Sequence, residues 1–438
     1  MKAEIKIRRI IMENINERQN PWALLPIGVF LVIFLGVGFL SKDFYTMPAI
    51  VAFLIALLVA FLQHQKHGFN KNMKVISRSI GDENIVTMCL IFLASGAFSG
   101  AVKAAGGVES TVNLGLSIMP SNIAVVGLFI IGCFISVSMG TSMGTIAAMA
   151  PIGVGISEKT GIPLPICIGA VVCGAMFGDN LSMISDTTIA AVRTQGCEMK
   201  DKFKENFIIV LPAAIITAIC FFVIAGNETS QNFGSLDYSF IKVMPYFLVL
   251  IGALIGINVF VVLISGTILS LIVGLSTGAM NFSNMFVSLG DGITGMYDIT
   301  IISIIVAAIV AIVKEYGGVN YILHVVKKRI RGKRGAEFGI SILVLLLDLC
   351  TANNTVAIVM AGPIAKELSD EFEVSPTRAA SLLDIFASLG QGIIPYGAQL
   401  LSAATLSSLT PIAIMRYLPY PLLMGISAIL FILFRKRK

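Results

Sequence analysis

Long apolar runs separated by short polar stretches occupy most of the chain. About 20 apolar residues are enough for a helix to cross the hydrocarbon core of a bilayer. Runs near this length lie at about 22–40, 46–62, 84–102, 164–193, 205–226, 241–258, 259–279, 299–314, 377–404 and 412–434. Two further apolar stretches, 121–157 and 337–366, are interrupted by small and polar residues. We expect each of these two to form a bent crossing or a re-entrant hairpin.

Composition indicates a chain that lies in a membrane. Of the 438 residues, 56% are hydrophobic and 13% are charged, whereas a soluble domain carries about 25% charged residues. We therefore expect an all-α polytopic protein of the cytoplasmic (inner) membrane, with the lipid bilayer as a partner. The charged first twenty residues are not followed by a short apolar core with a cleavage site, so no removable signal peptide is expected.

The positions of the basic residues predict the topology. The net charge is +6, but the basic residues lie between and beside apolar runs, which indicates topology signals and not a nucleic-acid partner. If 121–157 and 337–366 are hairpins, the basic clusters at 193–204, 327–334 and 435–438 all lie on the same side as the basic N-terminus. The positive-inside rule therefore favours about ten transmembrane helices, two re-entrant hairpins and two cytoplasmic termini.

Short motifs recur at a nearly constant offset, which indicates an internal duplication. The matched pairs are Val102–Val108 with Val313–Val319, Thr145–Ala147 with Thr355–Ala357, Pro151 with Pro363, Gly178-Asp179 with Gly390-Gln391, and Met183 with Pro395, at shifts of 210 to 212. The first copy starts inside by the charge count and the second starts outside. Two inverted-topology repeats with discontinuous helices are typical of secondary transporters.

These patterns divide the chain into five parts. Residues 1–83 hold the N-terminal tail and two scaffold helices, and 84–204 form the first repeat, with the hairpin 121–157 and a broken helix at 164–193. Residues 205–298 hold connecting or scaffold helices. The second repeat covers 299–408, with the hairpin 337–366 and a broken helix at 377–404, and 409–438 hold the last helix and a basic tail.

The stretch Gly178–Thr188 is the strongest candidate site, because it is far too polar for a lipid-facing span. A charge at the bilayer centre costs roughly 2.5–3.5 kcal/mol on insertion scales, so its acids must face protein or water. The alternative is a polar contact between helices. On a continuous helix Asp179, Ser182 and Asp186 would share one face, whereas an unwound chain would add carbonyls. The candidate ion- or substrate-binding residues here are Asp179, Asn180, Ser182, Ser185, Asp186 and Thr187.

The hairpin tips are candidates for the rest of the site, at about 138–145 and 350–355. Small residues let a backbone turn at membrane depth, and their hydroxyls and amides satisfy the freed backbone groups. Unwound carbonyls can bind a hard cation, and helix N-termini can face an anion. A role in packing is the alternative. The tips and the repeat offset add Thr141, Ser142, Thr145, Asn353, Asn354, Thr355 and Gln391.

Carboxylates must carry any transported proton, because no His lies in an apolar run. The candidates are Asp179, Asp186, Asp348 and Asp384, and for the last two a capped structural role is the open alternative. Asp179 and Asp186 are also the expected transient Na+ ligands. The seven Cys show no CxxC pair and most lie in apolar runs, so we expect packing residues. No cofactor is expected beyond Na+ and H+ as transported or coupling ions.

Gly178–Thr188 reads G-D-N-L-S-M-I-S-D-T-T and resembles the signature of the NhaC-type Na+/H+ antiporter family. The stretch Gly140–Thr145 also resembles that family's tip sequence, and the likeness covers both repeats. Met183 stands where the family usually has Pro, so a softer break is expected in the first copy. The wider ion-transporter superfamily implies an elevator mechanism, with 22–62 and 241–279 as scaffold and homodimer contact. Its members also carry amino acids or small carboxylates.

The sequence therefore predicts a cation-coupled secondary transporter and not an enzyme, with Na+/H+ antiport as the leading reaction. The close alternative is Na+- or H+-coupled movement of a small amino acid or carboxylate. A channel is a third reading, which a turnover measurement would exclude. An intramembrane aspartyl protease is remote, because Tyr297-Asp298 lies at a helix entrance and Ser288–Asp291 lacks the first Gly of the required motif.

Overall fold

The computed structural model describes residues 19–41, 47–63, 68–118, 121–183, 185–226, 236–255, 257–328 and 330–434. Every regular element in these ranges is helical. The elements are η1 (Pro21–Leu24), α2 (Leu25–Ser41), α3 (Ala49–Gln63), α4 (Phe69–Ile80), α5 (Glu83–Ala104), α6 (Gly107–Ile118), α7 (Ser121–Met139), α8 (Ser142–Thr160), α9 (Leu164–Leu181), α10 (Asp186–Gln195), α11 (Met199–Gly226), α12 (Phe240–Ile255), α13 (Val259–Ser276), α14 (Phe282–Thr294), α15 (Tyr297–Glu315), α16 (Gly318–Lys327), α17 (Gly332–Thr351), α18 (Asn354–Glu371), α19 (Pro376–Ile393), α20 (Ala398–Ser407), α21 (Pro411–Met415) and α22 (Pro419–Phe434).

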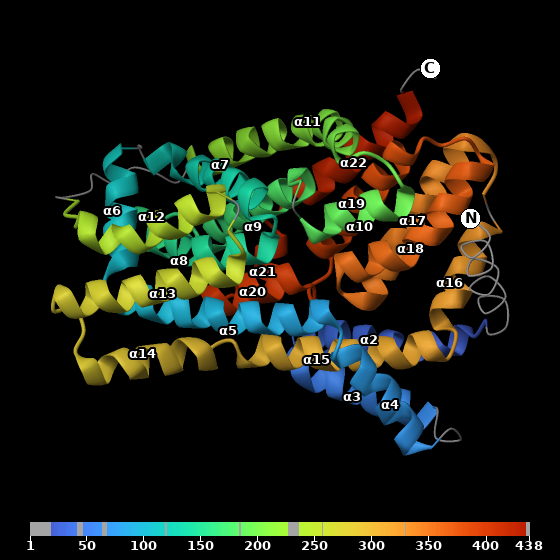
Figure 1. The fold of residues 1–438 in the computed structure, drawn as a ribbon, viewed down its shortest axis with the longest axis horizontal. Helices are drawn as coiled ribbons and strands as arrows, with labels where there is room; N and C mark the ends of the chain where they lie inside the picture. Colours follow the sequence, from blue (N-terminus) through green and yellow to red (C-terminus); the bar gives the residue numbers. More distant parts are fainter. Residues whose placement is uncertain are drawn as a thin grey trace.

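Most of the long helices lie along the long axis of the molecule in two broad groups, whereas α6 and α16 lie across it (Figure 1). On one side α15 contacts α2, α3 and α4, and α5 packs against α13 and α14. On the other side α9 lies among α7, α8, α11 and α22, and α17, α18 and α19 contact one another. The core of this second group consists mainly of Ala, Val, Ile and Leu. The candidate residues therefore lie on interior helices, as the cost of buried charge requires.

The number of membrane crossings is smaller by a strict test than the apolar runs suggest. Within the described ranges three helices are long and apolar enough to cross, or up to five if each of two bent pairs is one span. The bent pairs are α6 with α7, at 113°, and α15 with the helix that follows it, at 65°. Five shorter apolar helices cover much of the remaining runs. The count of ten crossings is not established and stays a prediction, as do the five-part division and the re-entrant placement of the hairpins.

Several helices were not anticipated from the sequence. Helix α4 carries Lys, Arg and Asn among few apolar residues, and α6, α14 and α16 are also short. Helix α14 approaches α5 closely, because a Cβ on Gly96 would lie 2.3 Å from the carbonyl oxygen of Gly292. Glycines on both helices permit this contact, which hydrophobicity alone does not indicate.

The two apolar stretches interrupted by small residues both form helical hairpins. In the first, α7 ends and Gly140 takes a positive φ of 66°, after which the Thr141 hydroxyl accepts a hydrogen bond from the Gly144 amide and caps α8. In the second, Ala352 takes a φ of 49° and the Asn353 side chain caps α18 at the Val356 amide. A positive φ at the turn reverses the chain in each case.

Two helices are interrupted at matching places. Helix α9 stops at Leu181 and α10 begins at Asp186, and α19 stops at Ile393 and α20 begins at Ala398. Both pairs have 18 and 10 residues, and the second pair follows the first by 212 positions. Helix α9 therefore stops as fully at Met183 as α19 does at Pro395, so the missing proline does not remove the break.

Candidate functional site

A cavity of about 490 Å³ lies where the hairpin tips meet the interrupted helices. We name it the central cavity. Its polar and tip residues are Glu83, Thr87, Gly140, Thr141, Ser142, Met143, Asp179, Asp186, Thr187, Asn258, Ala352, Asn353, Asn354, Thr355, Gln391, Ala398 and Gln399. Both tips, which are more than 200 residues apart in the chain, therefore line a single cavity together with both signature acids.

Asp179 lies in the last turn of α9 and is held by two serine hydroxyls. Ser142, at the first tip, donates to Asp179 Oδ2 at 3.0 Å, and Ser185, just after the break, donates to Asp179 Oδ1 at 2.6 Å. Ser185 also lies 2.8 Å from the hydroxyl of Thr187. Gln399 donates to Ser142 Oγ at 3.2 Å and so connects α20 to this group. Asp179 is 7% exposed, and it is the most enclosed acid on the cavity wall.

Asp186 contacts the second tip. It begins α10 and is exposed to the cavity, and its Oδ2 accepts a hydrogen bond of 2.9 Å from the hydroxyl of Thr355. The N-terminus of a helix stabilises a negative charge. Each hairpin tip therefore supplies a hydroxyl to a different acid of the same interrupted helix.

Five helices begin at the central cavity. Their first residues, which all line it, are Glu83 of α5, Ser142 of α8, Asp186 of α10, Asn354 of α18 and Ala398 of α20. A helix N-terminus carries roughly half a positive charge and unpaired amide donors. Together they favour anionic groups in the cavity, either the two carboxylates or the acid group of a bound solute.

Four of the residues predicted to bind an ion or substrate do not line the cavity. The Asn180 side chain points to Ser388 at 3.2 Å and to the Met424 sulfur at 3.0 Å. Thr145 bonds the Thr141 carbonyl oxygen at 2.9 Å, within its own helix. Ser182 is buried behind the break, and Ser185 reaches the cavity only through Asp179. The predicted segments therefore all contribute to the cavity wall, but not every predicted side chain points into the cavity.

Asp348 lies behind the cavity wall and reaches it through Gln391. The Gln391 amide donates to Asp348 Oδ1 at 2.7 Å. Asp348 is fully buried, and within the described ranges its Oδ2 and the Gln391 Oε1 have no hydrogen-bond partner. A Cβ on Gly390 would lie 2.1 Å from Asp348 Oδ2, so glycine is required beside this carboxylate.

Asp384 lies apart from the cavity and pairs with Lys202, which the sequence analysis treated only as a topology signal. The Lys202 side chain is 1% exposed and turns inward to the Asp384 carboxylate, so it also has an interior role that the sequence did not indicate. Asn206 follows one turn later on α11 and donates to the same Asp384 oxygen at 3.1 Å. A polar pair spaced by four residues at the start of an apolar run was the available signal.

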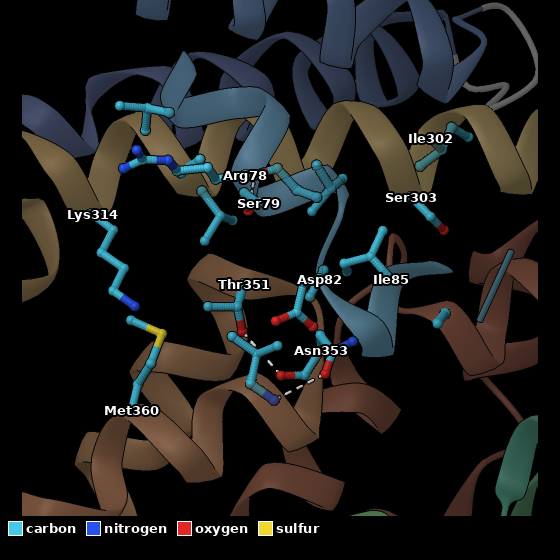
Figure 2. A pocket seen from close by; sticks show the side chains of 18 of the residues that line it. Arg78, Ser79, Asp82, Ile85, Ile302, Ser303, Lys314, Thr351, Asn353 and Met360 are labelled. Atoms are coloured by element: carbon cyan, nitrogen blue, oxygen red, sulfur yellow. Dashed lines mark hydrogen bonds between the residues drawn. The ribbon is translucent and has the colours of Figure 1, made fainter. Parts of the chain in front are cut away.

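A second cavity of about 800 Å³ adjoins the second tip. Figure 2 shows its labelled side chains, among them Arg78, Lys314 and Asn353. It shares Ala352, Asn353 and Ala398 with the central cavity, so the second tip lies between the two spaces. Polar groups therefore continue from the central cavity toward the exposed charges of α4 and α15.

The fold and the site define a helical membrane protein with paired carboxylates at interrupted helices and hairpin tips, an arrangement typical of secondary transporters. The profile of the Na+/H+ antiporter family matches residues 11–226 and 235–435. The chain belongs to this family, which confirms the resemblance of the signature to NhaC-type proteins.

Three relatives extend the comparison. The chain is 24% identical to the malate-2H+/Na+-lactate antiporter of Bacillus subtilis, over 85% of this chain and 86% of that protein. It is 25% identical to the Na+/H+ antiporter NhaC of the same organism, over 93% of this chain and 97% of that protein. It is 23% identical to the arginine/ornithine antiporter ArcD of Halobacterium salinarum, over 75% of this chain and 74% of that protein. Relatives of similar identity thus have different named solutes.

Proposed function

We propose that this chain is a cation-coupled secondary transporter that exchanges Na+ for H+ at the central cavity. The observation that carries the proposal is the pair Asp179 and Asp186 on one cavity wall, each bonded to a hydroxyl from a different hairpin tip. Carboxylate, hydroxyl and carbonyl oxygens are the ligands of hard cations. The family match supports cation-coupled antiport.

Competition for the same oxygens provides the exchange. Burial penalises the charged form of a carboxylate, and a ligand must lose its proton before it binds a metal ion. Na+ that enters from one side therefore displaces the proton from Asp179, and protonation from the other side releases Na+. Asp348 is a further proton candidate through Gln391, whereas the pairing of Asp384 with Lys202 supports a structural role.

An elevator movement would give alternating access. The matched lengths and spacing of α9–α10 and α19–α20 support a duplication, and we propose that its copies are inverted. Both hairpins would then move with the interrupted helices against a scaffold of α2, α3, α12 and α13. That scaffold would also provide the contact of a homodimer in the cytoplasmic membrane, with both termini inside.

Coupled movement of a small carboxylate or amino acid is the second candidate. The volume of about 490 Å³ exceeds what one ion needs, and five helix N-termini line the cavity. The names of the malate/lactate and arginine/ornithine relatives fit such a solute.

Proteoliposomes that contain a pH-sensitive dye separate the two candidates. Exchange of Na+ for H+ predicts an internal pH change when Na+ alone is added outside. A carrier of organic solutes predicts no such signal until malate, lactate, arginine or ornithine is supplied, and that result would replace the Na+/H+ reaction.

A further inference from the structure

The side chain of Lys202 lies in surroundings that match the ligands of a metal cation. Its Nζ donates to the Asn180 carbonyl oxygen at 3.0 Å and to Thr188 Oγ1 at 2.8 Å, and it pairs with Asp384 Oδ2. An ammonium group has three donors, so each donor has an acceptor. The acceptors are a carbonyl, a hydroxyl and a carboxylate, the oxygen types that hard cations prefer.

These acceptors belong to both interrupted helices. Asn180 lies in the last turn of α9, where carbonyl groups lack partners within the helix and the helix dipole favours a cation. Thr188 lies in the first turn of α10, on the other side of the break. Asp384 belongs to α19. The ammonium therefore connects the two halves of one interrupted helix to the other interrupted helix.

Asn206 strengthens this connection from the same face of α11. Its Nδ2 donates to the Asn180 carbonyl oxygen at 2.9 Å and to Asp384 Oδ2 at 3.1 Å, and the residue is fully buried. The exposed lysines nearby differ, since Lys204 has a side chain that is 64% exposed and a partner only at 3.9 Å.

We propose that Lys202 acts as a tethered cation at the break between α9 and α10. The ammonium occupies a monovalent-cation site formed by the Asn180 carbonyl, Thr188 and Asp384. It thereby fixes the end of α9, where Asp179 precedes Asn180 directly. Lys202 is a positioning residue, because it reaches the central cavity only through the backbone that carries Asp179; this consequence for transport rests on the proposed function.

Removing the side chain should leave a vacant cation site, which methylammonium can probe. In purified Lys202→Ala protein, the temperature of thermal unfolding should rise with added methylammonium. Wild type and the matched variant Lys200→Ala, which removes an exposed lysine two residues earlier, should not respond. Adding Asp384→Asn to Lys202→Ala should abolish the response. A Lys202→Ala protein indifferent to methylammonium, or an equal response in Lys200→Ala, overturns the proposal.

A second variant keeps the test decisive if Lys202→Ala does not fold. The double change Lys202→Met with Asp384→Leu leaves no unpaired charge, and such apolar replacements of buried ion pairs often preserve stability. If Lys202 acts as a tethered cation, this variant should fold, its apparent Na+ affinity should fall at least about tenfold, and its turnover should be nearly unchanged. A tenfold loss of affinity is about the effect expected when one charge-assisted hydrogen bond disappears. Wild-type affinity in this variant means that the pair only supports the fold.

The two proposals fail separately. If wild type shows no proton movement driven by Na+, the proposed reaction is wrong. The unfolding experiment needs no transport, so it still decides whether an oxygen-lined cation site lies behind Lys202.

Discussion

The hydroxyl of Ser185 offers a sharply defined perturbation of the site. Ser185 is fully buried, and its single hydroxyl hydrogen lies on the 2.6 Å bond to Asp179 Oδ1. The change Ser185→Ala removes this donor and leaves Ser142 as the remaining hydroxyl on the carboxylate. The backbone is unaffected because alanine tolerates the extended conformation at this position.

The size of the effect follows from the strength of that bond. A hydrogen bond to a charged group contributes about 1.5–3 kcal/mol, and about 1.4 kcal/mol corresponds to one pH unit. Water in the central cavity can replace part of the lost donor, so we expect the lower end. A donor stabilises the ionised carboxylate, and its loss lets the proton compete better with Na+. The pH of half-maximal Na+ transport should therefore move about one unit to the alkaline side.

The assay is the pH profile of Na+-dependent proton flux in proteoliposomes. Ser270→Ala is the matched control, because that buried hydroxyl donates to the Gly266 carbonyl of its own helix at 2.8 Å and lies on α13, outside the central cavity. The control should keep the wild-type profile. A Ser185→Ala profile that is unchanged, or that moves to the acid side, would refute the role given to Asp179.

Three further outcomes are expected. Gly178→Ala places a Cβ 2.3 Å from Ser136 Cβ and 2.5 Å from the backbone nitrogen of Val137. The unfolding temperature in detergent should therefore fall by the equivalent of about 1–3 kcal/mol, and full stability would contradict the close packing of α7 and α9. Arg378→Ala removes the cation that pairs with the buried Glu337 and the partly buried Glu205, and it should cost about 3–5 kcal/mol. Lys366→Ala, whose partner Asp370 is exposed, should cost under about 1 kcal/mol, and equal effects would refute the distinction. Cysteines at positions 200 and 333 should react with an impermeant reagent only from the cytoplasmic side, and labelling from outside would mean that a hairpin crosses the membrane.

The sequence predicted where the two helices are interrupted, but it did not predict how completely the first one breaks. A polar stretch inside an apolar run, and its counterpart at Gly390-Gln391, indicated where α9 and α19 stop. The proline missing at Met183 suggested a softer break in the first copy. In the structure Ser182 and Ser185 both take an extended conformation, one at the end of α9 and one before α10, and Ser185 bonds Asp179 across the gap. The helix is therefore interrupted without a proline.

The sequence pattern does not predict the direction of individual side chains at the site. Asn180 follows Asp179 in the signature, yet the break turns its amide toward Ser388 and its carbonyl toward Lys202. A basic residue among exposed lysines reads as a topology signal, and only the packing of α11 against α19 reveals that Lys202 is buried. The tips could be placed in one site because the repeat offset relates them, whereas the pairing of Thr355 with Asp186 depends on three-dimensional contact.

The most direct test of the central claim is uptake of radioactive Na+ into proteoliposomes, driven by a pH gradient, in wild type, Asp179→Asn and Asp186→Asn. Asp370→Asn is the control, since that acid lies on an exposed surface pair. The account predicts rapid uptake in wild type and the control and loss of gradient-driven uptake in Asp179→Asn and Asp186→Asn, with all four proteins folded. Full pH-driven uptake by both Asp179→Asn and Asp186→Asn would contradict it and place the exchange at other groups.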